Sequence, residues 1–126
     1  MIVLDTSVLI DALTGPRRSL AGLRGAIERS ERILIPSLVL FEWLRGPRTV
    51  QQLKAQESLF PADSAIPFDV HEAATGARLY RAVRRPRGRE IDLAIAAYAI
   101  VRQSPLWTLN ASDFRDIPEL RLWPIG

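Results

Sequence analysis

The sequence predicts an α/β fold with a mostly parallel sheet, because short apolar runs alternate along the chain with segments of helical periodicity. Its 126 residues suffice for one domain with one core, and 48% apolar and 25% charged residues are typical of a globular protein. The absence of cysteine and the single histidine, His71, exclude disulfide scaffolds, zinc fingers and thiol nucleophiles. No basic stretch precedes Asp5 and no apolar run suits a membrane span, so we expect a cytoplasmic protein.

The first half of the chain contains two apolar runs with the length and composition of buried strands. Ile2-Val3-Leu4 stops at Asp5-Thr6-Ser7, and apolar residues then recur at helical spacing until Gly15-Pro16. Ile33-Leu34-Ile35 is closed by Pro36, and Ser37 is the expected N-cap of the next helix. The predicted elements are a strand at 2–4, helices at 8–13 and 20–27, a strand at 33–35, and helices at 38–45 and 49–59.

The second half continues the alternation of strands and helices. Asp69 followed by Glu72 resembles a capping box at the start of a long helix, and Pro86-Arg87-Gly88 breaks that helix. Pro67 makes the apolar run around it a peripheral strand. The predicted elements are a strand at 65–68, helices at 69–83 and 91–101, and strands at 106–109 and 120–123.

Four acidic residues, Asp5, Glu42, Asp92 and Asp113, have mostly apolar neighbours. Asp5 and Asp113 each follow a predicted strand, and ligands of open α/β sheets bind beyond the carboxyl ends of the strands. Glu42 is the only acid of its helix, and Asp92 opens the Ala-rich helix. Each has a plain structural alternative: a helix N-cap for Asp5 and Asp113, a pair with Arg45 for Glu42, and a favourable helix dipole for Asp92.

These carboxylates would repel one another if the fold brought them together, and a divalent cation would remove that repulsion. Oxygen ligands without histidine or cysteine select hard ions, namely Mg²⁺, Mn²⁺ or Ca²⁺. Acids that hold Mg²⁺ or Mn²⁺ are typical of phosphoryl chemistry, in which the metal orients the phosphate and activates a water.

The basic residues are unevenly distributed, although the formal net charge is only +3. Six arginines and no acid lie between residues 78 and 89, namely Arg78, Arg81, Arg84, Arg85, Arg87 and Arg89. Such a block indicates a surface that binds a polyanion or an acidic partner. One alternative is a solvated helix end, whose cations complement the helix dipole. Arginine also outnumbers lysine in the whole chain, in which Lys54 is the single lysine, and a GC-rich genome is an alternative explanation for that excess.

Four short motifs, in this order and spacing, resemble those of PIN domains, and specifically of VapC-type toxin ribonucleases. They are Val3-Leu4-Asp5-Thr6-Ser7-Val8-Leu9-Ile10-Asp11, Phe41-Glu42-Trp43-Leu44-Arg45-Gly46, Asp92-Leu93-Ala94-Ile95-Ala96-Ala97 and the Thr-x-Asn-x-x-Asp-Phe stretch from Thr108 to Phe114. The resemblance covers essentially the whole chain and implies one PIN-like nuclease domain, residues 1–126. Its fold would have three layers, with a central sheet of four to five strands flanked by helices.

The resemblance also implies an activity: metal-dependent endonucleolytic hydrolysis of RNA that leaves 5′-phosphate and 3′-hydroxyl ends. Asp5, Asp92 and Asp113 would be ligands of Mg²⁺ or Mn²⁺, and Glu42 would help to bind the metal or orient the attacking water. Thr6, Ser7 and Asn110 would support them by hydrogen bonds. Arginines of the basic block would contact RNA or a partner, namely Arg81, Arg84, Arg85, Arg87 and Arg89. Glu90 is an extra acid near Asp92 and is expected to be a solvated cap rather than part of the pocket.

The implied partners are a second copy of the chain and a cognate antitoxin, whose tail would lie in the active-site groove and whose N-terminal domain would bind operator DNA. A non-catalytic module for RNA binding or antitoxin docking is the alternative from another class. It explains the arginines but not four acids beside a polyanion. Three other classes fit poorly: a haloacid dehalogenase-type phosphatase needs an acid at Ser7, a receiver domain needs a lysine after a late strand, and a Ser7–His71 hydrolase lacks its nucleophile elbow.

Overall fold

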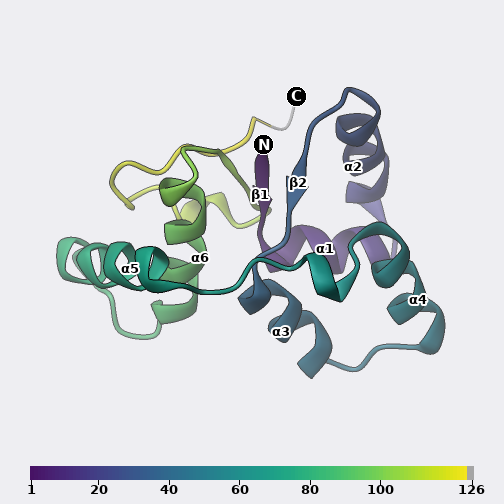
Figure 1. Ribbon diagram of the computed structural model, residues 1–126, viewed down its shortest axis with the longest axis horizontal. Coiled ribbons are helices and arrows are strands. Elements are labelled where there is room, and N and C mark those ends of the chain that lie inside the picture. Colours follow the sequence, from purple (N-terminus) through teal and green to yellow (C-terminus); the bar gives the residue numbers. More distant parts are fainter. Residues whose placement is uncertain (125–126) are drawn as a thin grey trace.

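Three short parallel strands form the centre of the molecule, in the order β2-β1-β3 (Figure 1). The computed structural model describes residues 1–124, so Ile125 and Gly126, the last two residues of the expected domain, lie outside the described part. The elements are β1 (Ile2–Leu4), α1 (Thr6–Leu13), α2 (Arg18–Glu28), β2 (Ile33–Leu34), α3 (Ser37–Arg45), α4 (Val50–Leu59), a 3-10 turn η1 (Ala62–Ser64), α5 (Val70–Ala82), α6 (Glu90–Val101), β3 (Leu106–Trp107) and a second turn η2 (Ala111–Asp113).

The sheet has three strands in the described chain rather than the four to five expected from the sequence. The apolar runs at 65–68 and 120–123 each contribute a single bridge, Ile66 to Pro36 and Leu122 to Leu106. The Ile66 bridge cannot continue past Pro36 because α3 begins at Ser37, whose N–H donates to Ile66 O at 2.8 Å. The Leu122 bridge consists of the bonds from Leu106 N to Arg121 O at 2.9 Å and from Trp123 N to Leu106 O at 2.8 Å. The predicted parallel arrangement is confirmed, since β1 pairs in parallel with both β2 and β3.

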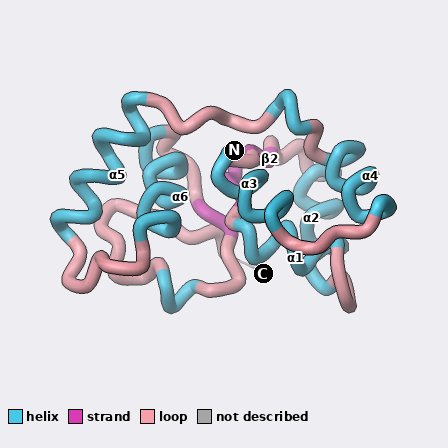
Figure 2. The backbone as a smooth tube through the Cα atoms, turned by 90° about the horizontal axis from the view of Figure 1, so that it is seen from below, coloured by secondary structure: helices cyan, strands magenta, loops and turns pink. Residues whose placement is uncertain are grey.

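Helices cover the sheet in two groups. The pair α5 and α6 lies at one end of the molecule and α2 and α4 lie at the other, with the strands and α3 between them (Figure 1 and Figure 2). The helix α6 is the most buried, with Ile95 to Ala99 fully enclosed. The helix α5 packs against α6 at Gly76, where a Cβ would meet Ala97 Cβ at an ordinary contact distance of 3.8 Å. None of the helices within residues 1–124 has the length and hydropathy to cross a bilayer.

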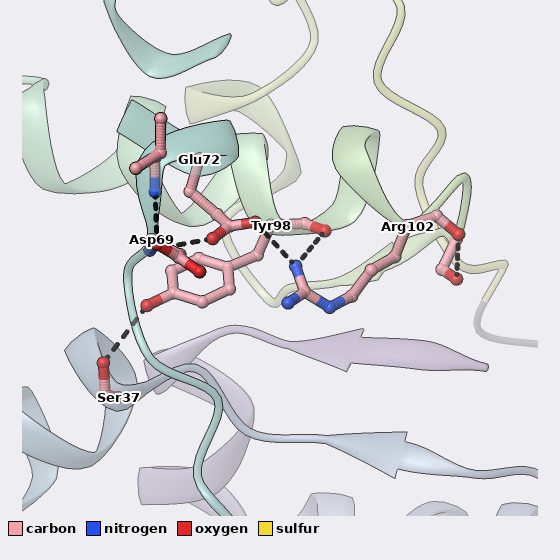
Figure 3. A network of polar contacts seen from close by, with 7 residues as sticks. Ser37, Asp69, Glu72, Tyr98 and Arg102 are labelled. Atoms are coloured by element: carbon pink, nitrogen blue, oxygen red, sulfur yellow. Dashed lines mark hydrogen bonds and ion pairs between the residues drawn. The ribbon is translucent and has the colours of Figure 1, made fainter. Parts of the chain in front are cut away.

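The capping box predicted at Asp69 and Glu72 is confirmed, and the structure adds a second one that the sequence analysis did not predict, at Thr49 and Gln52. In each box the Gln52 or Glu72 side chain accepts the backbone N–H of the capping residue. Ser37 was expected to be the N-cap of α3, and this prediction is wrong, because Pro36 occupies that position. The Ser37 hydroxyl lies 3.1 Å from the Tyr98 hydroxyl instead, which links α3 to α6 (Figure 3).

Candidate active site

Asp5 lies where β1 ends and α1 begins, and its side chain is held from β3. Only 4% of the residue is exposed. Its Oδ2 atom accepts hydrogen bonds from Ser7 Oγ at 2.8 Å and from Thr108 Oγ1 at 2.7 Å. Those hydroxyls in turn accept backbone N–H groups, Leu109 N to Ser7 Oγ at 3.0 Å and Asn110 N to Thr108 Oγ1 at 3.0 Å. The N-cap alternative for Asp5 is thus correct for its position but not for its bonds, since the side chain caps nothing.

Two supporting residues behave differently from the sequence expectation. Thr108 was not assigned a role, yet it holds Asp5 directly. Asn110, expected to support the site, donates its backbone N–H to Thr108 and lines the same cavity as Asp5. The sequence could have predicted that Thr108 lies near Asp5. Like Asp5, Thr108 directly follows a buried apolar strand, and parallel strands end at the same edge of the sheet.

Glu42 lies on α3 with both carboxylate oxygens occupied. Thr6 Oγ1 donates to its Oε1 atom at 2.6 Å, and Arg45 Nη2 lies 3.3 Å from its Oε2 atom. Both sequence interpretations of Glu42 therefore hold: it faces the acidic cavity, and it pairs with Arg45 one turn along the helix. Thr6, like Ser7, belongs to the first turn of α1 and takes the supporting position expected of it.

Asp92 and Asp113 complete the acidic group. Burial at the start of α6, followed by the charges of Asp5, Asp113 and Glu42, raises the pKa of Asp92 to about 6, against the opposing charge of Arg89. Asp5, Asp113 and Glu42 thus lie close enough to Asp92 to affect its protonation. Asp113 is the last residue of the turn η2, so its alternative as a helix N-cap does not apply.

An open cavity of about 540 Å³ lies against these carboxylates. Its wall includes Asp5, Glu42 and Asp92 but not Asp113, which approaches from the β3 side. Glu90 lines a separate groove between α5 and α6 instead. The cavity is therefore acidic on several sides and lies at the carboxyl ends of the strands, where sheets of this kind bind ligands.

The donor set suits a hard divalent cation, although no three acidic side chains of residues 1–124 form a ready-made metal cluster. Asp5 Oδ1 and the carboxylates of Asp92 and Asp113 accept no hydrogen bond from residues 1–124, whereas Asp5 Oδ2 and both oxygens of Glu42 are engaged. The uncompensated oxygens and the raised pKa of Asp92 are the features that a bound cation would relieve.

Of the expected contact residues in the arginine block, Arg89 is held in an ion pair and the others are exposed. Arg89 donates to both carboxylate oxygens of Asp116, at 2.6 and 2.8 Å, and to the backbone oxygen of Asp113 at 2.9 Å. Arg89 therefore fixes the loop that carries Asp113. The other expected contact residues, Arg81, Arg84, Arg85 and Arg87, are exposed at the end of α5 and in the loop before α6.

Comparison with known proteins identifies the family. The model of the PIN domain matches residues 2–120. The chain belongs to the PIN-domain family. This PIN domain is 35% identical over 123 residues to the protein named ribonuclease VapC19 of Mycobacterium tuberculosis, an alignment that covers 96% of this chain and 98% of the relative. The family predicted from the four sequence motifs is confirmed.

Solved structures share the fold of this PIN domain. A chain of the DNA-bound VapBC of Salmonella typhimurium superimposes with a TM-score of 0.76 and 20% identity, covering 97% of this chain and 96% of that chain. A chain of VapBC2 from Rickettsia felis, bound to a DNA fragment from their promoter, gives a TM-score of 0.74 and 23% identity, covering 98% and 100%. At these identities the likeness shows the fold of the PIN domain.

Proposed function

We propose that this PIN domain is a divalent-metal-dependent endoribonuclease and the toxin of a toxin–antitoxin pair. The observation that supports the activity best is the approach of Asp5, Glu42 and Asp113 to Asp92, whose pKa their charges raise, beside a cavity that Asp5, Glu42 and Asp92 line. The relative named as a ribonuclease supports the choice of RNA as substrate. The solved complexes named VapBC support a cognate antitoxin as partner. A homodimer and contact with operator DNA through the antitoxin remain parts of the same proposal.

In this mechanism Asp5, Asp92 and Asp113 would hold Mg²⁺ or Mn²⁺ through oxygens that accept no other hydrogen bond. When bound, such an ion would orient the scissile phosphate, lower the pKa of a water and stabilise the leaving oxygen. Ser7 and Thr108 both donate hydrogen bonds to Asp5 Oδ2, which fixes the carboxylate and leaves its Oδ1 atom free for a ligand. Glu42, held by Thr6, orients the attacking water in line with the phosphorus. The expected products carry 5′-phosphate and 3′-hydroxyl ends.

The decisive experiment is cleavage of total RNA by antitoxin-free protein with Mg²⁺, with Mn²⁺ and with EDTA. Asp5→Asn removes one charged ligand and retains the size of the side chain, so we expect the cleavage rate to fall at least about a hundredfold. Circular dichroism and thermal unfolding of the variant check that the fold is intact.

Asp63→Asn is the matched control, because Asp63 is an exposed acid in η1, outside the wall of the acidic cavity. Cleavage by this variant at the wild-type rate shows that the loss in Asp5→Asn is local. Cleavage that persists in EDTA or in Asp5→Asn contradicts the proposal. A folded protein that binds RNA and cleaves none with either metal favours the non-catalytic binding module.

A further inference from the structure

A second cavity of about 360 Å³ adjoins the acidic one between α1, α2 and the end of β3. Its wall consists of Asp11, Arg18, Ser19, Gly22, Trp107 and Leu109. Asp11 and Leu109 also line the acidic cavity, so the two hollows share a boundary. A polymer that places a phosphate at the acids therefore has room for an adjacent unit in this second cavity.

The apolar part of the wall is open because α2 carries a glycine in its interior. Gly22 faces the indole of Trp107, and a Cβ there would lie 3.4 Å from Cη2 and 3.5 Å from Cζ2. A longer side chain at this position would extend along the indole and fill the cavity. Glycine inside a helix is unfavourable relative to alanine, so the open space comes at the expense of helix stability. Leu109, 44% exposed, offers an apolar surface between the two cavities.

The polar part of the wall is a carboxylate with one oxygen free. Asp11 Oδ2 accepts from Ser19 N at 2.8 Å and from Ser19 Oγ at 2.6 Å, which ties α1 to the first turn of α2. Its Oδ1 atom accepts from no residue of the described chain, and a carboxylate can only accept hydrogen bonds. The exposed guanidinium of Arg18 beside it suits a phosphate.

We propose that this second cavity binds one nucleobase of the RNA next to the scissile phosphate, and that Asp11 selects a base with an exocyclic amino group. This inference rests on the proposed ribonuclease function. Trp107, Gly22 and Leu109 enclose the apolar body of the base, and Asp11 Oδ1 accepts from its amino group. Uracil presents its O4 carbonyl oxygen where cytosine presents its N4 amino group, so a carboxylate favours cytosine over uracil.

The test measures RNA binding in EDTA at low ionic strength, so that affinity does not depend on cleavage. The probes are oligocytidine and oligouridine of equal length, which differ in the group at position 4 of each base. We expect the wild-type protein to bind oligocytidine about tenfold more tightly than oligouridine. Asp11→Asn retains an oxygen for Ser19 but also offers an amide donor, so the preference should fall below about twofold or reverse.

Gly22 provides the second, independent variant pair. Gly22→Leu fills the cavity with a good helix former and should weaken oligocytidine binding about tenfold, whereas Gly22→Ala adds one methyl group and should stay within about twofold of wild type. Thermal unfolding shows whether each variant is folded. If Gly22→Leu does not fold, Asp11→Asn alone decides the matter.

Equal affinity of the wild-type protein for both oligonucleotides, or no measurable binding to either, overturns this inference. A preference for cytosine that persists in Asp11→Asn overturns it as well. Failure of the proposed function appears separately, as the absence of metal-dependent cleavage of total RNA by the wild-type protein. Where cleavage occurs, sequencing of the RNA ends should show a nucleotide preference beside the cut that changes in Asp11→Asn.

Discussion

Burial and three neighbouring carboxylates all raise the pKa of Asp92. Together they raise its pKa from an ordinary 3.8 to about 6, against the opposing charge of Arg89. Between those two values the folded protein binds more protons than the unfolded chain does. The free energy of unfolding therefore decreases as pH rises from about 4 to about 6, and the ionised Asp92 destabilises the metal-free protein at neutral pH.

Asp92→Asn should accordingly stabilise the metal-free protein at pH 7 and above. We expect its Tm in EDTA to exceed the wild-type value by about 3–6 °C, because the amide removes the repelled charge. The difference should vanish near pH 4, where Asp92 is protonated. Thermal unfolding between pH 4 and pH 8 measures both effects.

Asp116→Asn is the control of opposite sign, because Arg89 binds Asp116 and lowers its pKa. Its Tm at pH 7 should be slightly below that of the wild type. A Tm for Asp92→Asn equal to or below the wild-type value at all pH values contradicts the argument. Added Mg²⁺ should raise the Tm of the wild-type protein more than that of Asp92→Asn, since binding to the folded state stabilises it.

The pairing of α5 with α6 depends on a buried polar network as well as on small residues. Glu72 is only 2% exposed; its Oε1 atom accepts the backbone N–H of Asp69 at 2.8 Å, and its Oε2 atom lies 3.3 Å from Arg102 Nη1 (Figure 3). The Arg102 guanidinium also lies over the Tyr98 ring, 5.4 Å from its centroid. The Glu72 carboxylate thus completes the capping box of α5 and neutralises Arg102, directly after the end of α6.

Removal of this carboxylate should cost far more than removal of a surface pair. We expect Glu72→Ala to lower the free energy of unfolding by about 2–4 kcal/mol, because Arg102 loses its counter-charge and α5 its cap. Glu72→Gln keeps the capping oxygen and should cost about half as much. Urea unfolding measures both variants.

Arg78→Ala is the comparison variant on the same helix. Its ion pair with Glu119 is about half exposed, so the expected loss is below about 1 kcal/mol. Similar losses for Glu72→Ala and Arg78→Ala would show that the buried network does not stabilise the α5–α6 pair.

At the scale of the whole molecule, the arginine block offers exposed positive charge at the end of α5 and in the loop before α6. Arg78 and Arg89 of the block are held in ion pairs, which leaves Arg81, Arg84, Arg85 and Arg87 for an anionic partner. The acidic cavity repels RNA, and exposed cations elsewhere on the surface attract it.

Reversal of Arg81, Arg84 and Arg85 to Glu should therefore weaken RNA binding. If each contacts one phosphate, the slope of log affinity against log salt should become shallower by about 2. Fluorescence anisotropy over a salt series measures affinity and slope together.

The matched control reverses Arg24, Arg29 and Arg32, three exposed arginines on α2 and the loop after it, at the other end of the molecule (Figure 2). It changes the net charge equally, so a purely nonspecific charge effect would appear in both variants. Unchanged affinity and slope in the first variant would assign its arginines to the antitoxin or to solvent.

The positions of the helices and of Asp5 could be predicted from the sequence alone, through apolar periodicity, capping residues and motif spacing. The six helices of the described chain lie where the apolar spacing predicted them: α1 to α5 each bury one face, and α6 is enclosed along most of its length. Asp5 was predicted at the carboxyl-terminal edge of the sheet because it directly follows a buried parallel strand. These are local properties, decided by residues close together in the chain.

Only the tertiary structure decided which long-range partners these local pieces find. The sheet has three strands because the runs at 65–68 and 120–123 each form only a single bridge, and the Ser37 hydroxyl meets the Tyr98 hydroxyl instead of capping α3. Thr108 reaches Asp5 across 103 positions of the chain, and Arg89 is held by Asp116 instead of facing solvent. The physical reason is that side-chain bonds between distant residues depend on how the elements pack, which local spacing does not encode.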